Sequence, residues 1–164
     1  MPRKVYVLDT SAVIAGFVPG LAKAEQATVQ EVLEEASDLC SKLELETAVA
    51  AGKVRVVDPA RETLEEVGKR VAQTGDLVSA VDIKLLALAL DLKRSGEEPE
   101  LVTDDYAIQN LASLFDIPYQ RIVMPGIKEV LRWEMVCPAC NRRYTPTTSQ
   151  CEVCGSILVR KPRR

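Results

Sequence analysis

The sequence predicts an α/β protein with a central parallel β-sheet, followed by a small module built around cysteines. Over residues 5–123, short apolar runs alternate with longer segments of helical periodicity. Strands that alternate with helices favour right-handed β-α-β crossovers and hence a parallel sheet, with functional residues at the carboxyl edge. Two Cys-x-x-Cys pairs, separated by ten residues, follow this region.

The change in pattern also predicts how the chain is divided. We expect a main α/β domain over residues 1–123, a short helical linker over 124–134, a cysteine ribbon over 135–159 and a basic tail over 160–164. A chain of 164 residues suits one domain of ordinary size with a small appendage, because domains usually have about 100–200 residues.

The N-terminal third predicts a strand, a short helix and a long helix. Val5–Leu8 is an apolar run that ends at Asp9, and residues 10–15 follow as one or two helical turns. Residues 25–50 are expected to form one helix, because apolar residues recur there with a period of 3.6. The apolar stripe consists of residues 29, 32, 33, 36, 39, 40 and 43. Cys40 belongs to the stripe and is therefore predicted to lie in the core.

The remaining elements continue the alternation. Gly52 ends the long helix, and Val54–Val57 is the second predicted strand. The largely apolar segment 79–93 is typical of a helix buried against a sheet. The other predicted elements are a helix over 60–73, a strand over 101–103, a helix over 105–114, a strand over 121–123 and the helical linker.

Composition excludes several kinds of chemistry. The chain has no His, which rules out Ser/His or Cys/His nucleophiles, an imidazole general base and His-liganded zinc. The longest apolar run, Leu85–Leu90, has six residues, whereas a membrane span needs about 20. The N-terminus does not resemble a signal peptide. We therefore expect a soluble, cytoplasmic protein without a membrane partner.

The cysteine pairs predict one structural zinc ion. Cys137, Cys140, Cys151 and Cys154 have the spacing of two knuckles that each present two thiolates to zinc. In a reducing compartment this pattern indicates a metal site rather than disulfides. Asn141 and Gly155 directly follow the pairs, and both residue types tolerate the positive φ that turns amide N–H groups toward sulfur. So small a module needs the metal to fold.

Charge is distributed unevenly along the chain. Residues 137–164 hold six Lys and Arg against one acidic residue, whereas residues 1–136 hold 15 against 23. The basic end suggests a polyanionic partner. A single RNA strand is bound by cations, which contact its phosphates, and by an aromatic ring, on which a base stacks. We expect the residues that bind RNA here to be Arg142, Arg143, Tyr144, Arg160 and Lys161. The alternatives are a solubilising tail and a ribbon that only packs against the main domain.

Five acidic residues, Asp9, Glu35, Asp82, Asp104 and Asp105, stand apart from the ordinary surface charges. Asp9 and the Asp104-Asp105 pair end predicted strands, Asp82 points along the apolar face of its helix, and Glu35 borders the apolar stripe. Each residue also has a purely structural interpretation: the strand-end aspartates can cap helices, Ser79 and Asp82 have capping-box spacing, and Glu35 can be an ordinary helix charge.

Taken together, these carboxylates predict a divalent metal site. Strand-end aspartates at one sheet edge can meet a carboxylate from a buried helix, and such a cluster repels itself unless a cation neutralises it. Oxygen ligands without imidazole suit Mg²⁺ or Mn²⁺. A metal of this kind activates water and stabilises a phosphoryl transition state. The sequence thus favours phosphodiester hydrolysis, which needs no histidine.

Several sequence blocks resemble a known family. Leu8-Asp-Thr-Ser-Ala12, Glu35-Ala36, Ser79-x-x-Asp82 and Val102-Thr-Asp-Asp105 are similar to the blocks of PIN-domain ribonucleases. More narrowly, Thr28-Val-x-Glu-Val32, Thr74-Gly-Asp76 and Thr103-Asp-Asp-Tyr-Ala-Ile-Gln-Asn110, followed by a four-cysteine ribbon, resemble the Nin-one-binding endonucleases of small-subunit ribosome maturation.

The resemblance implies a Rossmann-like PIN fold over residues 1–123 and a metal-dependent endoribonuclease. Its substrate would be precursor small-subunit rRNA, cut at the 3′ end to leave a 3′-hydroxyl and a 5′-phosphate. Partners would be the pre-small-subunit particle and other assembly factors. The chain lacks extensions of eukaryotic relatives and therefore resembles an archaeal-type version. The alternatives are a non-catalytic RNA-binding assembly factor and a toxin-type PIN ribonuclease.

The resemblance also assigns roles to individual residues. Asp9, Glu35 and Asp82 would hold Mn²⁺ or Mg²⁺, with Asp104 or Asp105 completing the site. Thr10 and Ser11 would hydrogen-bond the carboxylates or the scissile phosphate, and Ser79 and Thr103 would support them.

Overall fold

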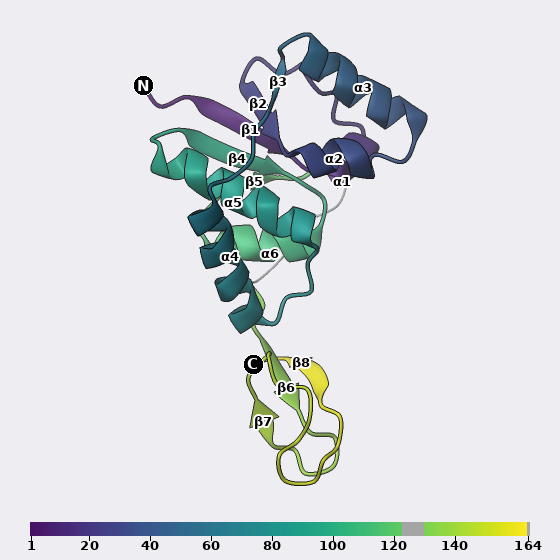
Figure 1. Ribbon diagram of the computed structural model, residues 1–164, viewed down its shortest axis with the longest axis vertical. Coiled ribbons are helices and arrows are strands. Elements are labelled where there is room, and N and C mark those ends of the chain that lie inside the picture. The colour runs from purple at the N-terminus through teal and green to yellow at the C-terminus, as the bar shows by residue number, and fades with distance from the viewer. Residues whose placement is uncertain (123–129, 164) are drawn as a thin grey trace.

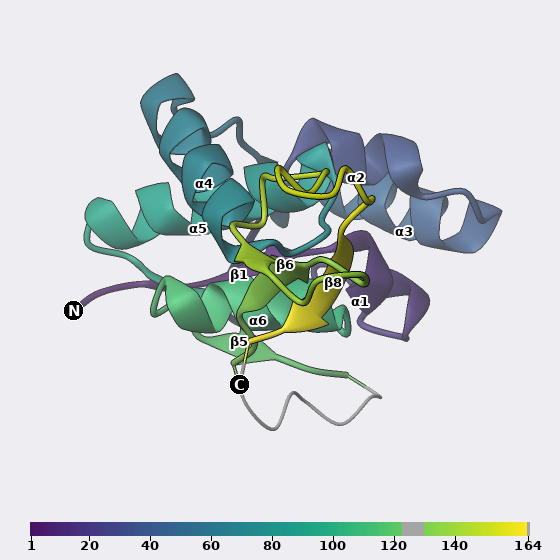
Figure 2. The same ribbon diagram turned by 90° about the horizontal axis from the view of Figure 1, so that it is seen from below.

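The computed structural model describes residues 1–122 and 130–163, which form two parts (Figure 1). The elements of the main domain are β1 (Lys4–Leu8), α1 (Thr10–Ile14), β2 (Glu25–Thr28), α2 (Gln30–Glu35), α3 (Leu39–Ala50), β3 (Val54–Val56), α4 (Arg61–Thr74), α5 (Ala80–Arg94), β4 (Glu98–Val102), α6 (Tyr106–Leu114) and β5 (Tyr119–Gln120). The ribbon contains β6 (Trp133–Val136), β7 (Arg143–Tyr144) and β8 (Val159–Pro162). It lies at the opposite end of the molecule from α3, and Figure 2 views the molecule from the ribbon end.

The main sheet is parallel throughout, with the strand order β3-β2-β1-β4-β5. This confirms the predicted α/β class with a central parallel sheet. The chain runs outward from β1 to β2 and β3, then crosses to β4 on the other side of β1. The strand order therefore reverses between β1 and β4, and open α/β sheets bind ligands at the carboxyl ends of the strands at such a point.

The core lies on both faces of the sheet. Val5 and Val7 of β1 belong to the larger apolar cluster, which includes the buried leucines of α5 and α6. Leu8 belongs to a second cluster, which includes Ala12 of α1 and Ala48 of α3. The alternation of side chains along a strand explains this division.

Helix α5 is the main buried helix. Leu85, Leu86 and Leu88 are at most 1% exposed, and burial of such a side chain contributes about 1.5–3 kcal/mol. This confirms the prediction of a helix packed against the sheet. None of the helices in the described ranges is long and apolar enough to cross a membrane.

The predicted single helix over residues 25–50 is wrong. The segment contains strand β2 and the two helices α2 and α3, separated by a bend after Glu35. The backbone is extended at Ala36, with ψ of 97°, and Asp38 caps α3 by accepting from the N–H of Ser41 at 2.8 Å. Polar residues conceal strand β2. Gln26 and Thr28 are buried in an interior strand of the sheet, where apolar residues are usual.

The break in this segment also corrects the prediction for Cys40. After the bend, α3 presents a different face to the core, and its buried residues are Ser41, Leu45 and Ala48. Cys40 is exposed, and so is Leu43. The apolar stripe therefore holds only up to Ala36, because a period of 3.6 cannot continue through a bend.

Two predicted strands are shifted. Strand β4 begins at Glu98 instead of residue 101 and therefore includes Pro99. Proline fits here because β5 pairs with β4 only from Leu101 onward, so no ladder hydrogen bond is lost at Pro99. Strand β5 lies at residues 119–120 instead of 121–123, and Val123 lies outside the described residues.

The ribbon is an antiparallel sheet with the strand order β7-β6-β8. Trp133 and Glu134, predicted to end a helical linker, belong to β6, and residues 124–129 lie outside the described residues. Arg160 and Lys161, predicted to begin a separate tail, pair with β6 as part of β8. The domain boundaries at residues 123, 134 and 159 stay predictions.

Candidate active site and metal centre

Asp9 lies at the carboxyl end of β1 and is only 5% exposed. The hydroxyl groups of Ser11 and Thr103 both donate to its Oδ2 atom, at 2.6 Å and 2.8 Å. The strand register explains this meeting, because Leu8 of β1 is paired with Val102 of β4. The residues that directly follow the two strands are therefore neighbours at the switch point.

Asp82 approaches from the N-terminus of α5. The N–H of Ser79 donates to Oδ2 of Asp82 at 2.7 Å, and the N–H of Asp82 donates to Oγ of Ser79 at 3.2 Å. These bonds form a complete capping box. The capping interpretation of the Ser79 and Asp82 spacing is thus correct, and the same bonds fix the position of the Asp82 carboxylate.

Glu35 reaches the start of α1 from the end of α2. The hydroxyl of Thr10 donates to Oε2 of Glu35 at 3.3 Å, and the glutamate is otherwise exposed. A carboxylate at a helix C-terminus is electrostatically unfavourable. The bend after Glu35 therefore places an acidic group where a bound cation would relieve the repulsion.

Asp104 and Asp105 have different surroundings. Oδ1 of Asp104 accepts from the N–H of Ile122 at 2.7 Å, and the N–H of Asp104 donates to Oγ of Ser11 at 3.2 Å. Asp105 caps α6, because its Oδ1 accepts from two backbone N–H groups at 2.8 Å and 3.3 Å. Asp104 is half-buried and Asp105 is exposed. Both stay candidates for the fourth carboxylate.

The electrostatics of Asp9 indicate an acidic environment among the described residues. Burial raises the pKa of the Asp9 carboxyl, and the negative charge of Asp82 raises it further, whereas the Ser11 and Thr103 hydroxyls lower it. No ion pair between described residues reaches Asp9, Glu35 or Asp82. In the described part of the chain, only the four cysteines are close enough to form a ready metal site. The candidate carboxylates are more widely spaced than the four sulfur atoms.

Two buried polar residues that were not among the predicted site residues hold the backbone of this edge. The hydroxyl of Thr28 donates to the carbonyl of Leu8 at 2.8 Å, and the amide of Gln109 donates to the carbonyl of Thr103 at 3.1 Å. Both side chains are fully buried. Each lies inside one of the sequence blocks that resemble the Nin-one-binding endonucleases. Its position in such a block is the feature of the sequence that could have identified it.

We predict that Asp9→Asn stabilises the protein in the absence of Mn²⁺ and Mg²⁺ at neutral pH. The folded-state pKa of Asp9 is raised, so its ionised form costs stability above that pKa, and the cost disappears below the unfolded value of about 3.9. Urea unfolding of both proteins should show the advantage of the variant shrinking as the pH falls. A constant difference across the pH range would contradict this prediction.

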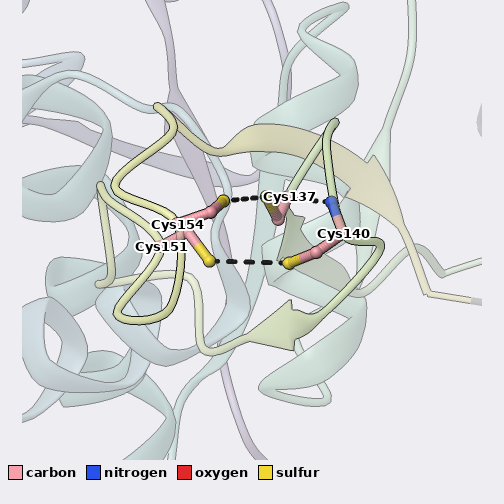
Figure 3. Close-up of side chains that lie close together, drawn as sticks. All are labelled: Cys137, Cys140, Cys151 and Cys154. Atoms are coloured by element: carbon pink, nitrogen blue, oxygen red, sulfur yellow. Dashed lines mark hydrogen bonds between the residues drawn. The ribbon is translucent and has the colours of Figure 1, made fainter.

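The four cysteines of the ribbon converge as the sequence predicts (Figure 3). Their sulfur atoms all lie within 4.8 Å of one another, with 3.4 Å between Cys137 and Cys154 and 3.6 Å between Cys140 and Cys151. Asn141 and Gly155 have positive φ values of 57° and 72°. This arrangement of four sulfurs can hold one metal ion.

The Tyr144 hydroxyl contacts the cysteine cluster, and the stacking of its half-buried ring on RNA stays a prediction. Its hydroxyl lies 3.1 Å from the sulfur of Cys151 and accepts from the N–H of Glu152 at 3.3 Å. The Tyr144 hydroxyl lowers the pKa of Cys151 to about 6, and that hydrogen bond raises the pKa of Tyr144 to about 12. A thiol with a lowered pKa binds metal more readily. The structure therefore gives this ring a position beside the metal centre.

The predicted basic residues do not share one surface role. Arg142 and Lys161 are exposed, and Arg143 is exposed but forms an ion pair with Glu134 at 3.2 Å. Arg160 instead stacks over the ring of Trp133, with its guanidinium carbon 3.7 Å from the ring centre. This arginine packs against its own ribbon.

A groove of about 780 Å³ lies between the ribbon and the ends of α4 and α6. Four arginines line it, namely Arg70, Arg132, Arg143 and Arg163. Arg70 donates to the carbonyl of Leu114 at 3.0 Å, whereas Arg132 and Arg163 form no ion pair with a described residue. Only Arg143 among them was predicted, because residues far apart in the sequence give no sign that they line one groove.

The chain matches the family described as the PIN domain of ribonuclease over residues 6–92. It is 35% identical over 162 residues to Endoribonuclease Nob1 of Methanothermobacter thermautotrophicus, covering 96% of this chain and 93% of that protein. It is 36% identical over 162 residues to Endoribonuclease Nob1 of Pyrococcus abyssi, covering 96% and 94%. Ribonuclease VapC1 of Thermoplasma acidophilum is 31% identical over 158 residues, covering 95% and 77%.

The family match and the geometry agree. The matched region contains three of the five candidate carboxylates, and the similarity to the Nob1 proteins extends over the ribbon as well. The chain therefore belongs to the PIN-domain ribonucleases, in the family of the archaeal Nob1 endoribonucleases.

Proposed function

We propose that this protein is a metal-dependent endoribonuclease that cleaves precursor small-subunit rRNA at its 3′ end during ribosome maturation. The observation that carries the proposal is the buried carboxylate of Asp9, which faces the charge of Asp82 without an ion pair to a described residue. The family's Nob1 endoribonucleases support RNA as the substrate. We place the reaction in the cytoplasm, on the pre-small-subunit particle and with other assembly factors.

The donor set fits a hard divalent cation, Mn²⁺ or Mg²⁺. All candidate ligands are carboxylate oxygens, which these ions prefer. Both hydroxyl donors of Asp9 bind Oδ2, and we assign Oδ1 as the ligand atom. Glu35 and Asp82 would add one oxygen each, and Asp104 or Asp105 would complete the set.

The residues of the site prepare hydrolysis of a phosphodiester bond. A bound divalent cation lowers the pKa of water and offsets charge on the phosphoryl group. Ser11 and Thr103 hold Asp9, Thr10 holds Glu35, and Ser79 holds Asp82, so that the carboxylates stay in place as charge develops. Net addition of one water would break the bond between phosphorus and O3′, with its hydroxyl going to phosphorus and its second proton to O3′, and would leave a 3′-hydroxyl and a 5′-phosphate.

We propose that the cysteine centre holds one structural zinc ion. Four thiolates in a tetrahedral arrangement are the common structural ligand set of zinc. The two metal sites then differ in chemistry: oxygen ligands hold the catalytic cation, and sulfur ligands hold the structural one.

The proposed activity is tested with an RNA that spans the 3′ end of the small-subunit rRNA. We expect one major cut in the presence of Mn²⁺ or Mg²⁺ and none when both are omitted, with zinc retained in both reactions. Cleavage at the same rate without added divalent metal would contradict the proposal.

We predict that Arg142→Gln combined with Arg143→Gln weakens RNA binding by removing interactions with phosphate groups. Removal of each such interaction lowers the slope of log affinity against log salt by about one, so the slope of the double variant should fall by about one to two. Fluorescence anisotropy with labelled RNA measures this slope. Arg61→Gln is the matched control, because Arg61 is exposed on α4, away from the ribbon. Equal slopes for the double variant and the wild type would exclude these interactions.

A further inference from the structure

Asp76 lies at the junction of the main domain and the ribbon, in the loop between α4 and α5. Oδ1 of its carboxylate accepts from Nε1 of Trp133 at 3.0 Å, and both of its oxygens lie 3.2 Å from the side-chain amide of Asn110. One aspartate thus joins the α4–α5 loop, helix α6 and the first strand of the ribbon.

Asn110 extends this junction on the main domain. It is 3% exposed, and its side-chain amide pairs with the backbone of Leu131, donating to the carbonyl at 2.9 Å and accepting from the N–H at 2.5 Å. The residues just before β6 are therefore fixed to α6 by two further hydrogen bonds.

The ribbon side of the junction is also closely packed. The guanidinium of Arg160 stacks on Trp133, and its buried Nε has no hydrogen-bond partner among the described residues. A Cβ atom at Gly75 would lie 2.7 Å from Cβ of Trp133 and 2.8 Å from Cβ of Pro146. Contacts this short leave no room for a side chain at residue 75, so the loop and the ribbon are complementary in shape.

The same junction is attached to both catalytic segments. Asp76 lies three residues before Ser79, which holds the carboxylate of Asp82. Asn110 lies on α6, which begins directly after Asp105. An RNA bound to the ribbon would therefore be held at a set distance from the carboxylates.

We propose that Asp76 is a positioning residue that fixes the ribbon in one orientation and thereby sets which phosphodiester bond of a long RNA reaches the carboxylates. The proposal rests on the proposed function. It requires that removal of the Asp76 hydrogen bonds changes where a long RNA is cut, while a short RNA that cannot reach the ribbon is cut as before.

The contact itself is tested without any activity. Trp133 is the single tryptophan of the chain, so its fluorescence reports on this junction alone. In the zinc-loaded Asp76→Ala protein we expect faster quenching by acrylamide. Residual dipolar couplings should change from one shared alignment tensor to separate tensors for the main domain and the ribbon. Glu62→Ala is the matched control, because it removes one exposed carboxylate from α4.

The consequence for the reaction is tested with two RNAs. On an RNA that spans the 3′ junction, Asp76→Ala should lower the rate at the major cut by about 10- to 100-fold, the cost of a misplacement of about 1 Å, and cuts at neighbouring bonds should appear. On a short RNA its rate should equal that of the wild type. Asp76→Asn, which keeps an oxygen acceptor for Trp133, should restore the major cut.

Three outcomes would overturn the proposal. They are an unchanged tensor and quenching rate in Asp76→Ala, an unchanged cut position on the long RNA, and an equal loss on both RNAs. A wild-type protein that cuts neither RNA contradicts the proposed function and the cleavage part of this proposal, whereas the fluorescence and coupling measurements still decide whether Asp76 fixes the ribbon.

Discussion

Asp9→Asn and Asp82→Asn are each expected to reduce metal-dependent RNA cleavage by about 10²- to 10³-fold, the size of effect seen when a charge-stabilising group is removed from an active site. Each change replaces a charged oxygen ligand with a neutral amide while keeping the size of the side chain. Single-turnover cleavage with saturating protein measures the rate of the chemical step. The rates should not recover when more Mn²⁺ is added to overcome weaker binding.

Neighbouring residues provide controls for this experiment. Glu34 and Glu35 are consecutive and exposed, but only Glu35 contacts Thr10. We expect Glu35→Gln to slow cleavage strongly and Glu34→Gln to leave it unchanged. The pair Asp104→Asn and Asp105→Asn identifies the fourth carboxylate, because only the ligand should show a large loss. Wild-type rates in Asp9→Asn or Asp82→Asn would refute the assigned site.

The second large effect is expected from removal of zinc. Structural zinc sites contribute about 10–16 kcal/mol to the folding of small modules, as much as the whole stability of an ordinary domain, which is about 5–15 kcal/mol. The ribbon has only three buried residues in its own apolar cluster, and two of these are the metal-site residues Cys137 and Cys151. A zinc chelator should therefore unfold the ribbon and leave the main domain folded.

Amide exchange resolved by residue measures this difference. Amides of β6 and β8 should lose protection on chelation, while those of β1 and β4 keep it. RNA affinity should fall at the same time. If affinity stayed unchanged after the ribbon unfolded, the ribbon would serve only to pack against the main domain.

The sequence predicted the elements whose local pattern agrees with their tertiary environment. Helix α5 is apolar along its length and buried, and the Ser79 cap marks its start. The cysteine centre was predictable in full, because metal-ligand spacing is a local property of the chain. The position of Asp9 followed from a strand end, and that of Asp82 followed from its capping-box spacing with Ser79.

Other features depend on contacts between distant residues and had no local signal. Strand β2 is concealed because Gln26 and Thr28 are buried and hydrogen-bonded, which their residue types do not suggest. The prediction that Cys40 is buried was wrong, because the bend before α3 turns a different set of residues toward the core. The junction at Asp76 depends on a hydrogen bond from Trp133, which lies 57 residues later in the chain.

The chemical nature of the cut ends tests most directly whether the carboxylate site hydrolyses RNA with a metal-activated water. The precursor RNA is cleaved by wild type with Mn²⁺, and the two new termini are identified by their reactivity toward kinase, phosphatase and ligase. Hydrolysis by a metal-activated water predicts a 3′-hydroxyl and a 5′-phosphate, and neither should form with Asp9→Asn. A 2′,3′-cyclic phosphate with a 5′-hydroxyl would contradict it, because that product forms when the RNA's own 2′-hydroxyl attacks the phosphorus.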